Sequence, residues 1–285
     1  MIEIVPGEPR SRRAEPFNDR NRAGRGGASA TFALALVVLA VTACGVVVEG
    51  ELKGRPLNLD LDPRRTIVVI WNHGFSPEAA GTYRPEAPPI IERLVERNRD
   101  VVLFKQLRNG TWLGELDHSA YVDAAIASLV AEQHVPVENI ILSGQSCGAW
   151  GSLQTAVFRY PNIGGIVAFA PTCHGRLPHA PRLRARRGEE IIAIARQLRA
   201  PGMLFLYAGD SFYSVDDWAG FEARTLARQP GLRVERLSRE RVLTVCDACV
   251  ADSHSAVWGD GFADAFFETH LQPLIDVVRV RTKPR

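Results

Sequence analysis

The sequence lacks an excess of charge of either sign. Its 34 basic and 32 acidic residues give a formal net charge of +2 over 285 residues, so nothing at the level of the whole chain indicates a nucleic-acid partner. The sequence also lacks an internal repeat, a heptad array and a low-complexity tract, which excludes solenoids, coiled coils and fibrous proteins. The remaining possibilities are one large α/β domain or two small ones, with ordinary apolar content.

An uncharged stretch follows a basic segment near the N-terminus. Residues 26–48 carry no charge, and several arginines precede them, which is the order of charge and apolar core in an export signal. The stretch contains Val41-Thr42-Ala43-Cys44-Gly45, which resembles a bacterial lipobox, where small residues precede a cysteine that receives a lipid. We therefore predict that residues 1–43 are a tail and export signal and that Cys44 is lipidated.

Two other interpretations of this stretch stay open. It is long enough for an uncleaved membrane anchor, and it could also be a buried helix of the folded domain. The β-branched run at 46–48 argues against the buried helix. A signal and an anchor both place residues 44–285 on the periplasmic or extracellular side, attached to the membrane or secreted.

Four cysteines lie in this exported part of the chain. Cys147, Cys173, Cys246 and Cys249 are an even number in an oxidising compartment, which predicts disulfides, with buried free thiols as the alternative. Four cysteines permit three pairings, and the spacing alone does not choose among them.

The pair Cys246 and Cys249 has the spacing of a redox motif. With Cys173 and His174 it could also bind zinc. The pair precedes a polar histidine loop instead of starting a helix, so we favour a structural disulfide that stiffens this loop. Cys147 and Cys173 follow strands that are predicted to be neighbours, and they could form a second disulfide.

Apolar, β-branched runs alternate with segments of helical periodicity. The runs indicate strands buried on both faces, and they cover residues 46–52, 66–70, 101–104, 140–142, 163–169, 203–207 and 232–237. The helical segments are 88–97, 121–130, 150–160, 189–198 and 262–278, the last with Pro273 inside it. This alternation predicts an α/β fold with a mostly parallel central sheet, covered by helices on both faces, in one domain over residues 44–285.

The run Gly144-Gln145-Ser146-Cys147-Gly148 lies between a predicted strand and a predicted helix. This is the context in which a G-x-S-x-G motif forms a nucleophile elbow. Small residues two before and two after the serine are needed because the backbone approaches closely there. The motif predicts that Ser146 is a nucleophile, with an ordinary glycine-rich turn as the alternative.

A serine nucleophile of this type needs a histidine base late in the chain. His254 lies in the polar run Asp252-Ser253-His254-Ser255, just before the last helix, and it is the predicted base. His270 is the alternative, although it falls inside the amphipathic segment 262–278.

The third member should be an acid at the carboxyl end of a strand. Asp210 follows the predicted strand 203–207 almost directly, at the edge where a parallel sheet places its active site. Asp216 and Asp217 are the alternatives, and both also suit the first turn of a helix.

An oxyanion formed on the substrate would need two N–H donors. The backbone N–H of Cys147 is one candidate, because it follows the nucleophile. The second candidate is the N–H of Phe75, in the run Asn72-His73-Gly74-Phe75 after the strand 66–70. A plain strand-ending turn is the alternative for that run.

Together these features resemble the α/β-hydrolase superfamily over roughly residues 60–280. The acid loop 206–212 and the histidine loop 252–254 are similar to those of dienelactone-hydrolase-like and prolyl-oligopeptidase-like members. The resemblance implies a serine hydrolase that cleaves a small-molecule ester, or less readily an amide or peptide, without a cofactor or metal. Cys147 and the Cys246–Cys249 pair depart from the family pattern and leave the substrate open.

Two further interpretations complete the sequence analysis. A membrane-tethered binding protein without turnover, built on the same scaffold, is the alternative to an enzyme. Residues 173–188 contain five arginines and two histidines between a predicted strand and helix, where this superfamily often inserts a lid. A basic lid would attract anionic substrates or lipid headgroups, whereas a solvated basic loop would have no such role.

Overall fold

The computed structural model describes residues 46–50, 62–74, 82–83, 86–106, 108–109, 114–226, 228–229 and 231–282. All of them belong to one compact unit, Val41–Arg285. The predicted export signal, the lipidation site Cys44 and the predicted oxyanion donor Phe75 lie outside the described residues. No helix in the described part of the chain combines the length and the apolar character that a bilayer crossing requires.

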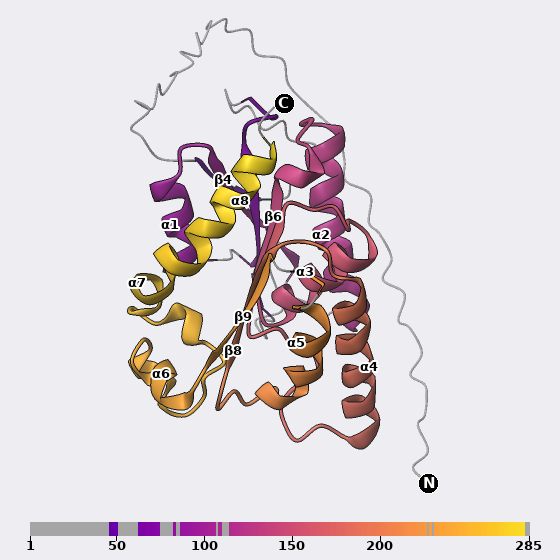
Figure 1. Ribbon diagram of the computed structural model, residues 1–285, viewed down its shortest axis with the longest axis vertical. Helices are drawn as coiled ribbons and strands as arrows, with labels where there is room; N and C mark the ends of the chain where they lie inside the picture. Colours follow the sequence, from indigo (N-terminus) through magenta and orange to yellow (C-terminus); the bar gives the residue numbers. More distant parts are fainter. Residues whose placement is uncertain are drawn as a thin grey trace, which may run out of the picture. The chain divides into compact units, whose positions relative to one another are not determined.

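A parallel sheet runs through the centre of this unit (Figure 1). In the described residues it has seven strands in the order β1-β4-β2-β6-β7-β8-β9, and every neighbouring pair is parallel. The strands are β1 Val46–Gly50, β2 Ile67–Asn72, β4 Val101–Gln106, β6 Ile140–Gln145, β7 Gly165–Phe169, β8 Gly202–Tyr207 and β9 Leu232–Leu237. A separate antiparallel pair joins β3 Thr82–Tyr83 to β5 Arg108–Asn109.

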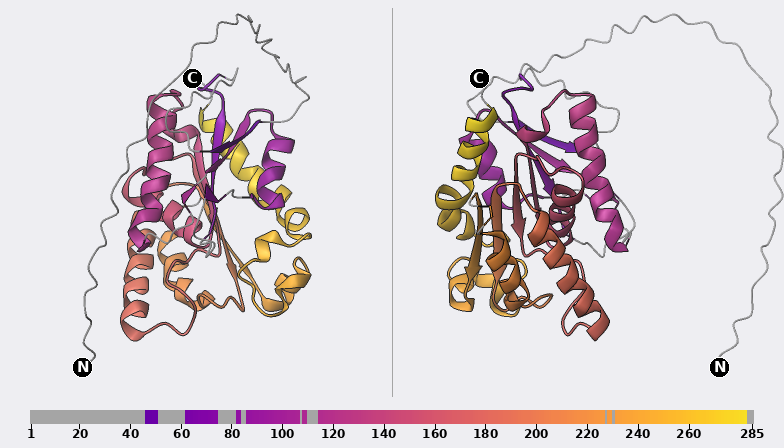
Figure 2. Two further views of the ribbon diagram at one scale, coloured as in Figure 1. Left: turned by 180° about the vertical axis from the view of Figure 1, so that it is seen from behind. Right: turned by 45° about the vertical axis from the view of Figure 1, so that its right-hand side comes forward.

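Helices cover both faces of the sheet (Figure 2). One layer packs around α3 and contains α2 Gly114–Ala131, α3 Cys147–Phe158, α4 Pro181–Gln197 and α5 Ala219–Thr225. The opposite layer contains α1 Pro89–Arg97, α7 Phe262–Phe266 and α8 Gln272–Thr282, while the short α6 Arg239–Leu243 follows β9. The predicted fold class is confirmed: an α/β fold with a parallel sheet covered on both faces.

The central strands are mostly apolar because helices bury both faces of the sheet, and their polar residues, such as Asn72, Ser143 and Gln145, lie toward the carboxyl ends of β2 and β6. Every residue of β2, β6, β7 and β8 is buried, as the continuous apolar runs predicted. The edge strand β9 is different: its end residues Leu232 and Leu237 are buried and the charged residues between them are not. The carboxyl ends of neighbouring strands therefore meet at one edge of a rigid sheet.

Several helices differ from their predicted bounds. Helix α2 begins at Gly114, seven residues before the predicted start, and α3 begins at Cys147, three residues before it. Helix α4 begins at Pro181, eight residues before the predicted start. The predicted helix 262–278 is divided by a π-helical turn, Phe267–Leu271, which directly precedes α8. Pro273 has no N–H to donate back to the preceding turn, and Arg233 donates instead to the carbonyl of Thr269 at 3.1 Å.

Candidate active site

Ser146 occupies a sharp turn between β6 and α3. Its backbone has φ +56° and ψ −124°, a left-handed conformation that is costly for a residue with a side chain. Its N–H donates to the carbonyl of Phe169 at 3.0 Å, and its own carbonyl accepts from the N–H of Trp150 at 3.0 Å. These bonds hold the turn, and helix α3 begins at the next residue, Cys147.

The two glycines of the motif are required by close backbone contacts. A Cβ on Gly148 would lie 2.0 Å from the carbonyl oxygen of Asn72 and 2.5 Å from that of His73. A Cβ on Gly144 would lie 2.6 Å from the backbone of Gly148. No side chain fits at either place, which is the steric reason that the G-x-S-x-G pattern predicted.

His254 connects Ser146 to Asp210. Its Nε2 lies 2.8 Å from the hydroxyl of Ser146, and its Nδ1 lies 2.7 Å from a carboxylate oxygen of Asp210. The carboxylate can only accept, so we assign the proton to Nδ1, which leaves the Nε2 lone pair to accept from the serine hydroxyl. The three side chains come from the ends of β6 and β8 and from the loop before α7, and they meet at the carboxyl edge of the sheet.

Asp210 is held rigidly in this arrangement. Its side chain is completely buried, and its second carboxylate oxygen accepts from the N–H of Phe212 at 2.7 Å. The ring of Phe212 lies 4.2 Å from the ring of His254, centroid to centroid. The loop after β8 therefore supplies both a carboxylate and an aromatic wall for the imidazole.

The loop that carries His254 is bonded to the loop after β8. Asp252 accepts from the N–H of His254 and from the N–H of Ser211, both at 3.0 Å, and also from the hydroxyl of Ser211. Partial burial alone would raise the pKa of the Asp252 carboxyl, but these hydrogen bonds from Ser211 and His254 outweigh it and lower the pKa. Sequence reasoning missed this role of Ser211 and Asp252; the only signal was their position beside Asp210 and His254.

Of the two predicted oxyanion donors, only Cys147 lies within the described residues. Cys147 is the first residue of α3, so its N–H is one of the helix-terminal donors without a partner inside the helix. A Cβ on Gly74 would lie 3.2 Å from the Cβ of Ser146, so the turn after β2 approaches the nucleophile from the other side. Phe75 is the next residue along the chain.

The alternative site residues have other partners. Asp216 and Asp217 lie in a 3₁₀ turn, Val215–Trp218, where Ser214 caps the N-terminus. Asp217 pairs with Arg187 at 3.3 Å. His270 lies in the π-helical turn, with its Nε2 3.3 Å from Glu235.

Both predicted disulfides are present. Cys147 is bonded to Cys173, and Cys246 is bonded to Cys249. This pairing argues against the zinc alternative, because the sulfur atoms of Cys173, Cys246 and Cys249 are all used in disulfide bonds. Among the described residues, no group of three metal-ligating side chains is positioned to hold an ion.

The basic segment 173–188 is not one loop. Its second half, from Pro181 onward, forms the first two turns of α4. His174, His179 and Arg187 are buried, and the Nε2 of His174 lies 3.0 Å from Glu190. The segment is therefore partly packed into the domain. Two histidines and one of its five arginines are not available at the surface.

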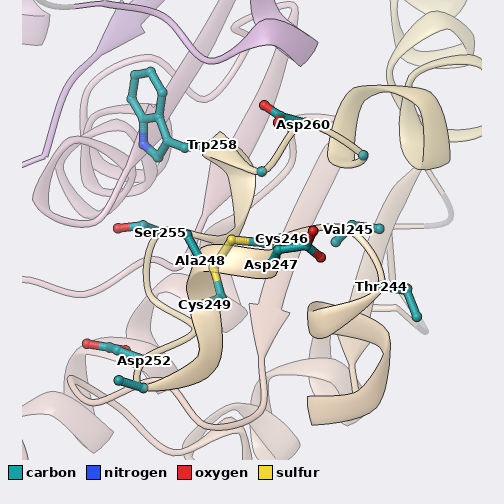
Figure 3. A pocket seen from close by; sticks show the side chains of 13 residues that line it. Thr244, Val245, Cys246, Asp247, Ala248, Cys249, Asp252, Ser255, Trp258 and Asp260 are labelled. Atoms are coloured by element: carbon teal, nitrogen blue, oxygen red, sulfur yellow. A yellow bond between two sulfur atoms is a disulfide. The ribbon is translucent and has the colours of Figure 1, made fainter.

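A surface cavity of about 560 Å³ adjoins the histidine loop (Figure 3). Its walls include the Cys246–Cys249 disulfide, Asp252, Ser255 and Trp258. Asp252 and Ser255 lie on either side of His254 in the sequence, but neither His254 nor Ser146 lines the cavity. The indole of Trp258 contacts that of Trp71 edge-on, at 6.3 Å between centroids.

Comparison with known proteins identifies no family for this chain. No protein-family model and no curated protein matches the sequence. Among solved structures, an esterase of Pyrococcus furiosus is 18% identical with a TM-score of 0.44, over 66% of this chain and 80% of that chain. Esterase 2 of Thermogutta terrifontis, phosphonylated by cyclosarin, is 16% identical with a TM-score of 0.48, over 79% and 88%. The strand order and the covered parallel sheet are those of an α/β-hydrolase fold.

Proposed function

We propose that the protein is a serine hydrolase that cleaves an ester by acyl transfer. The observation that carries this proposal is the continuous hydrogen-bonded chain from Ser146 through His254 to the buried Asp210, with distances of 2.8 Å and 2.7 Å. Such a chain activates a hydroxyl that is otherwise a weak nucleophile. The strained backbone of Ser146 supports the same conclusion, because strain of this kind is concentrated at functional sites.

The mechanism follows from these positions. The Oγ of Ser146 attacks the ester carbonyl while Nε2 of His254 takes its proton, and Asp210 stabilises the resulting imidazolium. The N–H of Cys147, joined by that of Phe75, donates to the oxyanion of the tetrahedral intermediate. His254 then protonates the departing alcohol. A water molecule, activated by the same histidine, releases the acid and restores Ser146.

The cavity next to the histidine loop, lined by Asp252, Ser255 and Trp258, supports a small substrate by its size. Its volume of about 560 Å³ falls in the range of small-molecule sites. Small-molecule esters are therefore the substrates to examine first.

Covalent labelling with a fluorophosphonate tests the proposal, because the probe reacts with an activated serine. We expect labelling of the wild type and none of Ser146→Ala. His254→Ala should lower hydrolysis of a short activated ester about as much, since the members act as a unit. Asp210→Asn should lower it roughly 10⁴-fold, by analogy with the serine-protease triad.

Asp216→Asn and His270→Ala are the matched controls for this experiment. Both remove a titratable side chain that was an alternative for the triad and that has other surroundings in the fold, so activity should be unchanged. Full labelling of Ser146→Ala would refute the mechanism. An unlabelled, folded wild type would favour the non-catalytic binding protein instead.

We further propose that the protein is exported and attached to the membrane through lipidated Cys44. The charge pattern of residues 1–43 and the lipobox-like ending support this proposal. The two disulfides support it as well, because structural disulfides persist in oxidising compartments and are rare in the cytosol.

A further inference from the structure

Arg187 is a charged side chain inside the domain. It is 1% exposed, and its guanidinium lies 5.4 Å, 5.5 Å and 5.9 Å from the ring centres of Trp150, Tyr213 and Trp218. Burial lowers the pKa of Arg187, although Asp217 acts in the opposite direction. A buried cation is costly unless it is paired and hydrogen-bonded, so its hydrogen-bond partners should indicate what it does.

These partners lie on two sides of the guanidinium. On one side, Nε donates to the carboxylate of Asp217 at 3.3 Å. On the other, Nη1 donates to the hydroxyl of Thr172 at 2.8 Å and lies 3.3 Å from Nδ1 of His174. The N–H of Cys173 also points at this Nδ1, from 3.4 Å. Because both neighbours are donors, we assign the proton of His174 to Nε2, which then donates to Glu190.

The segment that Arg187 binds is the one that contacts the nucleophile. We call residues 169–174 the brace. Its first carbonyl, on Phe169, accepts from the N–H of Ser146 at 3.0 Å, and the N–H of Thr172 donates to the carbonyl of Ser146 at 3.4 Å. Cys173 is bonded covalently to Cys147. The brace therefore holds both the nucleophile and the residue after it.

The brace cannot hold this shape by local preference alone. Ala170 has φ +46°, a conformation that is unfavourable for alanine and persists only when the surroundings impose it. The N–H of Ala170 donates to the carbonyl of Phe205 at 3.0 Å, and from helix α4 Arg187 and Glu190 hold the following residues, Thr172 and His174. These contacts connect one buried arginine to the backbone on either side of Ser146.

We propose that Arg187 is a positioning residue, which fixes the brace and thereby aims the backbone N–H of Cys147 at the oxyanion. This inference rests on the proposed function. The guanidinium does not touch the substrate; it acts through Thr172, His174 and the Cys147–Cys173 bond. A misplacement of about 1 Å can cost roughly 100-fold in rate, so loosening the brace should affect the transition state more than substrate binding.

Arg187→Lys is the decisive variant. It keeps a positive charge but loses the planar guanidinium, whose Nε binds Asp217 while its Nη1 contacts Thr172 and His174. We expect a folded protein with an unchanged KM for a short activated ester and a kcat lowered about 10-fold to 100-fold, because an oxyanion donor contributes mainly in the transition state. Arg182→Met is the control: it removes an exposed arginine from the same helix and should leave kcat unchanged.

Amide hydrogen exchange supplies a readout that needs no turnover. The N–H groups of Ser146 and Thr172 should exchange faster in Arg187→Lys than in the wild type, and at the wild-type rate in Arg182→Met. Thr172→Val removes one acceptor with little change of volume, and it should lower kcat in the same direction but by less. It also replaces Arg187→Lys as the test if the lysine variant does not fold.

Two results would overturn the inference. One is a folded Arg187→Lys with wild-type kcat, whatever its exchange rates. The other is a lowered kcat without faster exchange at Ser146 and Thr172, because the arginine would then act by another route. If the wild type has no hydrolase activity, the proposed function fails on its own, and the exchange rates still decide whether Arg187 holds the brace.

Discussion

Ser146 has a backbone conformation that a residue with a side chain adopts only when its surroundings force it. Left-handed or otherwise sparsely populated conformations cost about 1–3 kcal/mol. Here three backbone hydrogen bonds, the start of helix α3 and the approach of the turn after β2 all act on the same residue. The result is a hydroxyl that projects from the edge of the sheet within reach of one histidine.

The glycines around Ser146 give a prediction at this scale. Gly148→Ala puts a Cβ 2.0 Å from a backbone carbonyl that belongs to the end of β2 and cannot move freely. We expect a loss of at least about 3 kcal/mol in urea unfolding, as for severe overpacking, and no fluorophosphonate labelling.

Gly188→Ala is the control for this substitution. Gly188 lies within helix α4, and no atom lies within 4 Å of where its Cβ would be. The same added methyl group should therefore stabilise the protein by about 0.5–1 kcal/mol, the usual gain for alanine over glycine in a helix. Equal unfolding curves for the two variants would contradict the steric account of the motif.

The sequence predicts the three triad residues more easily than the residues that hold them. Ser146, Asp210 and His254 each follow an element whose type can be inferred from its pattern. In the sequence, Ser211 and Asp252 look like ordinary turn residues. Their contact joins two loops that are 41 residues apart, so neither local sequence shows the partner. Periodicity contains no information about such a contact, so the supporting hydrogen bonds could only be found in the folded structure.

At the scale of elements, the strands were the most predictable part. Their apolar runs are short, continuous and bounded by polar residues, and the edge strand β9 was predicted with its observed bounds, Leu232–Leu237. Helix α4 was predicted too short for a physical reason. Its buried positions are Arg187, Ile191, Ile194 and Ala195, so an arginine occupies the first place in an otherwise apolar stripe and hides the helical period.

The two disulfides close loops of very different length, which gives a second prediction. Cys147 and Cys173 are 26 residues apart, and Cys246 and Cys249 are three apart. In the chain-entropy account the long loop contributes about 3.5 kcal/mol and the short one about 1.6 kcal/mol. Urea unfolding of the two double Cys→Ala variants should show this order, and the reverse order would contradict it.

Thiol titration provides the check on this experiment. The unfolded, unreduced protein should show no free thiol among these four cysteines, whereas each double variant should still contain one intact disulfide. Four titratable thiols in the wild type would mean that the bonds do not form.

At the scale of the whole molecule, the N-terminal residues give a prediction about the mature protein. If Cys44 is lipidated after cleavage, intact mass measurement should find a chain that begins at Cys44 and carries lipid, and the protein should partition into detergent. Cys44→Ser is the matched control, because it keeps the small side chain but removes the thiol that carries the lipid, and it should not enter the detergent phase. Residues 1–43 still attached to the wild type would favour the uncleaved anchor.

The all-parallel sheet has a consequence for how fast the chain can fold. Each neighbouring pair of strands needs a crossover, and Val46 of β1 pairs with Val102 of β4 across more than fifty residues of chain. Folds dominated by such distant pairings form over about milliseconds to seconds, because loop closure must precede the stabilising contacts. The order of the elements adds to this delay: Asp210 and His254 come late in the sequence, so the site cannot be complete until the last third of the chain has been made.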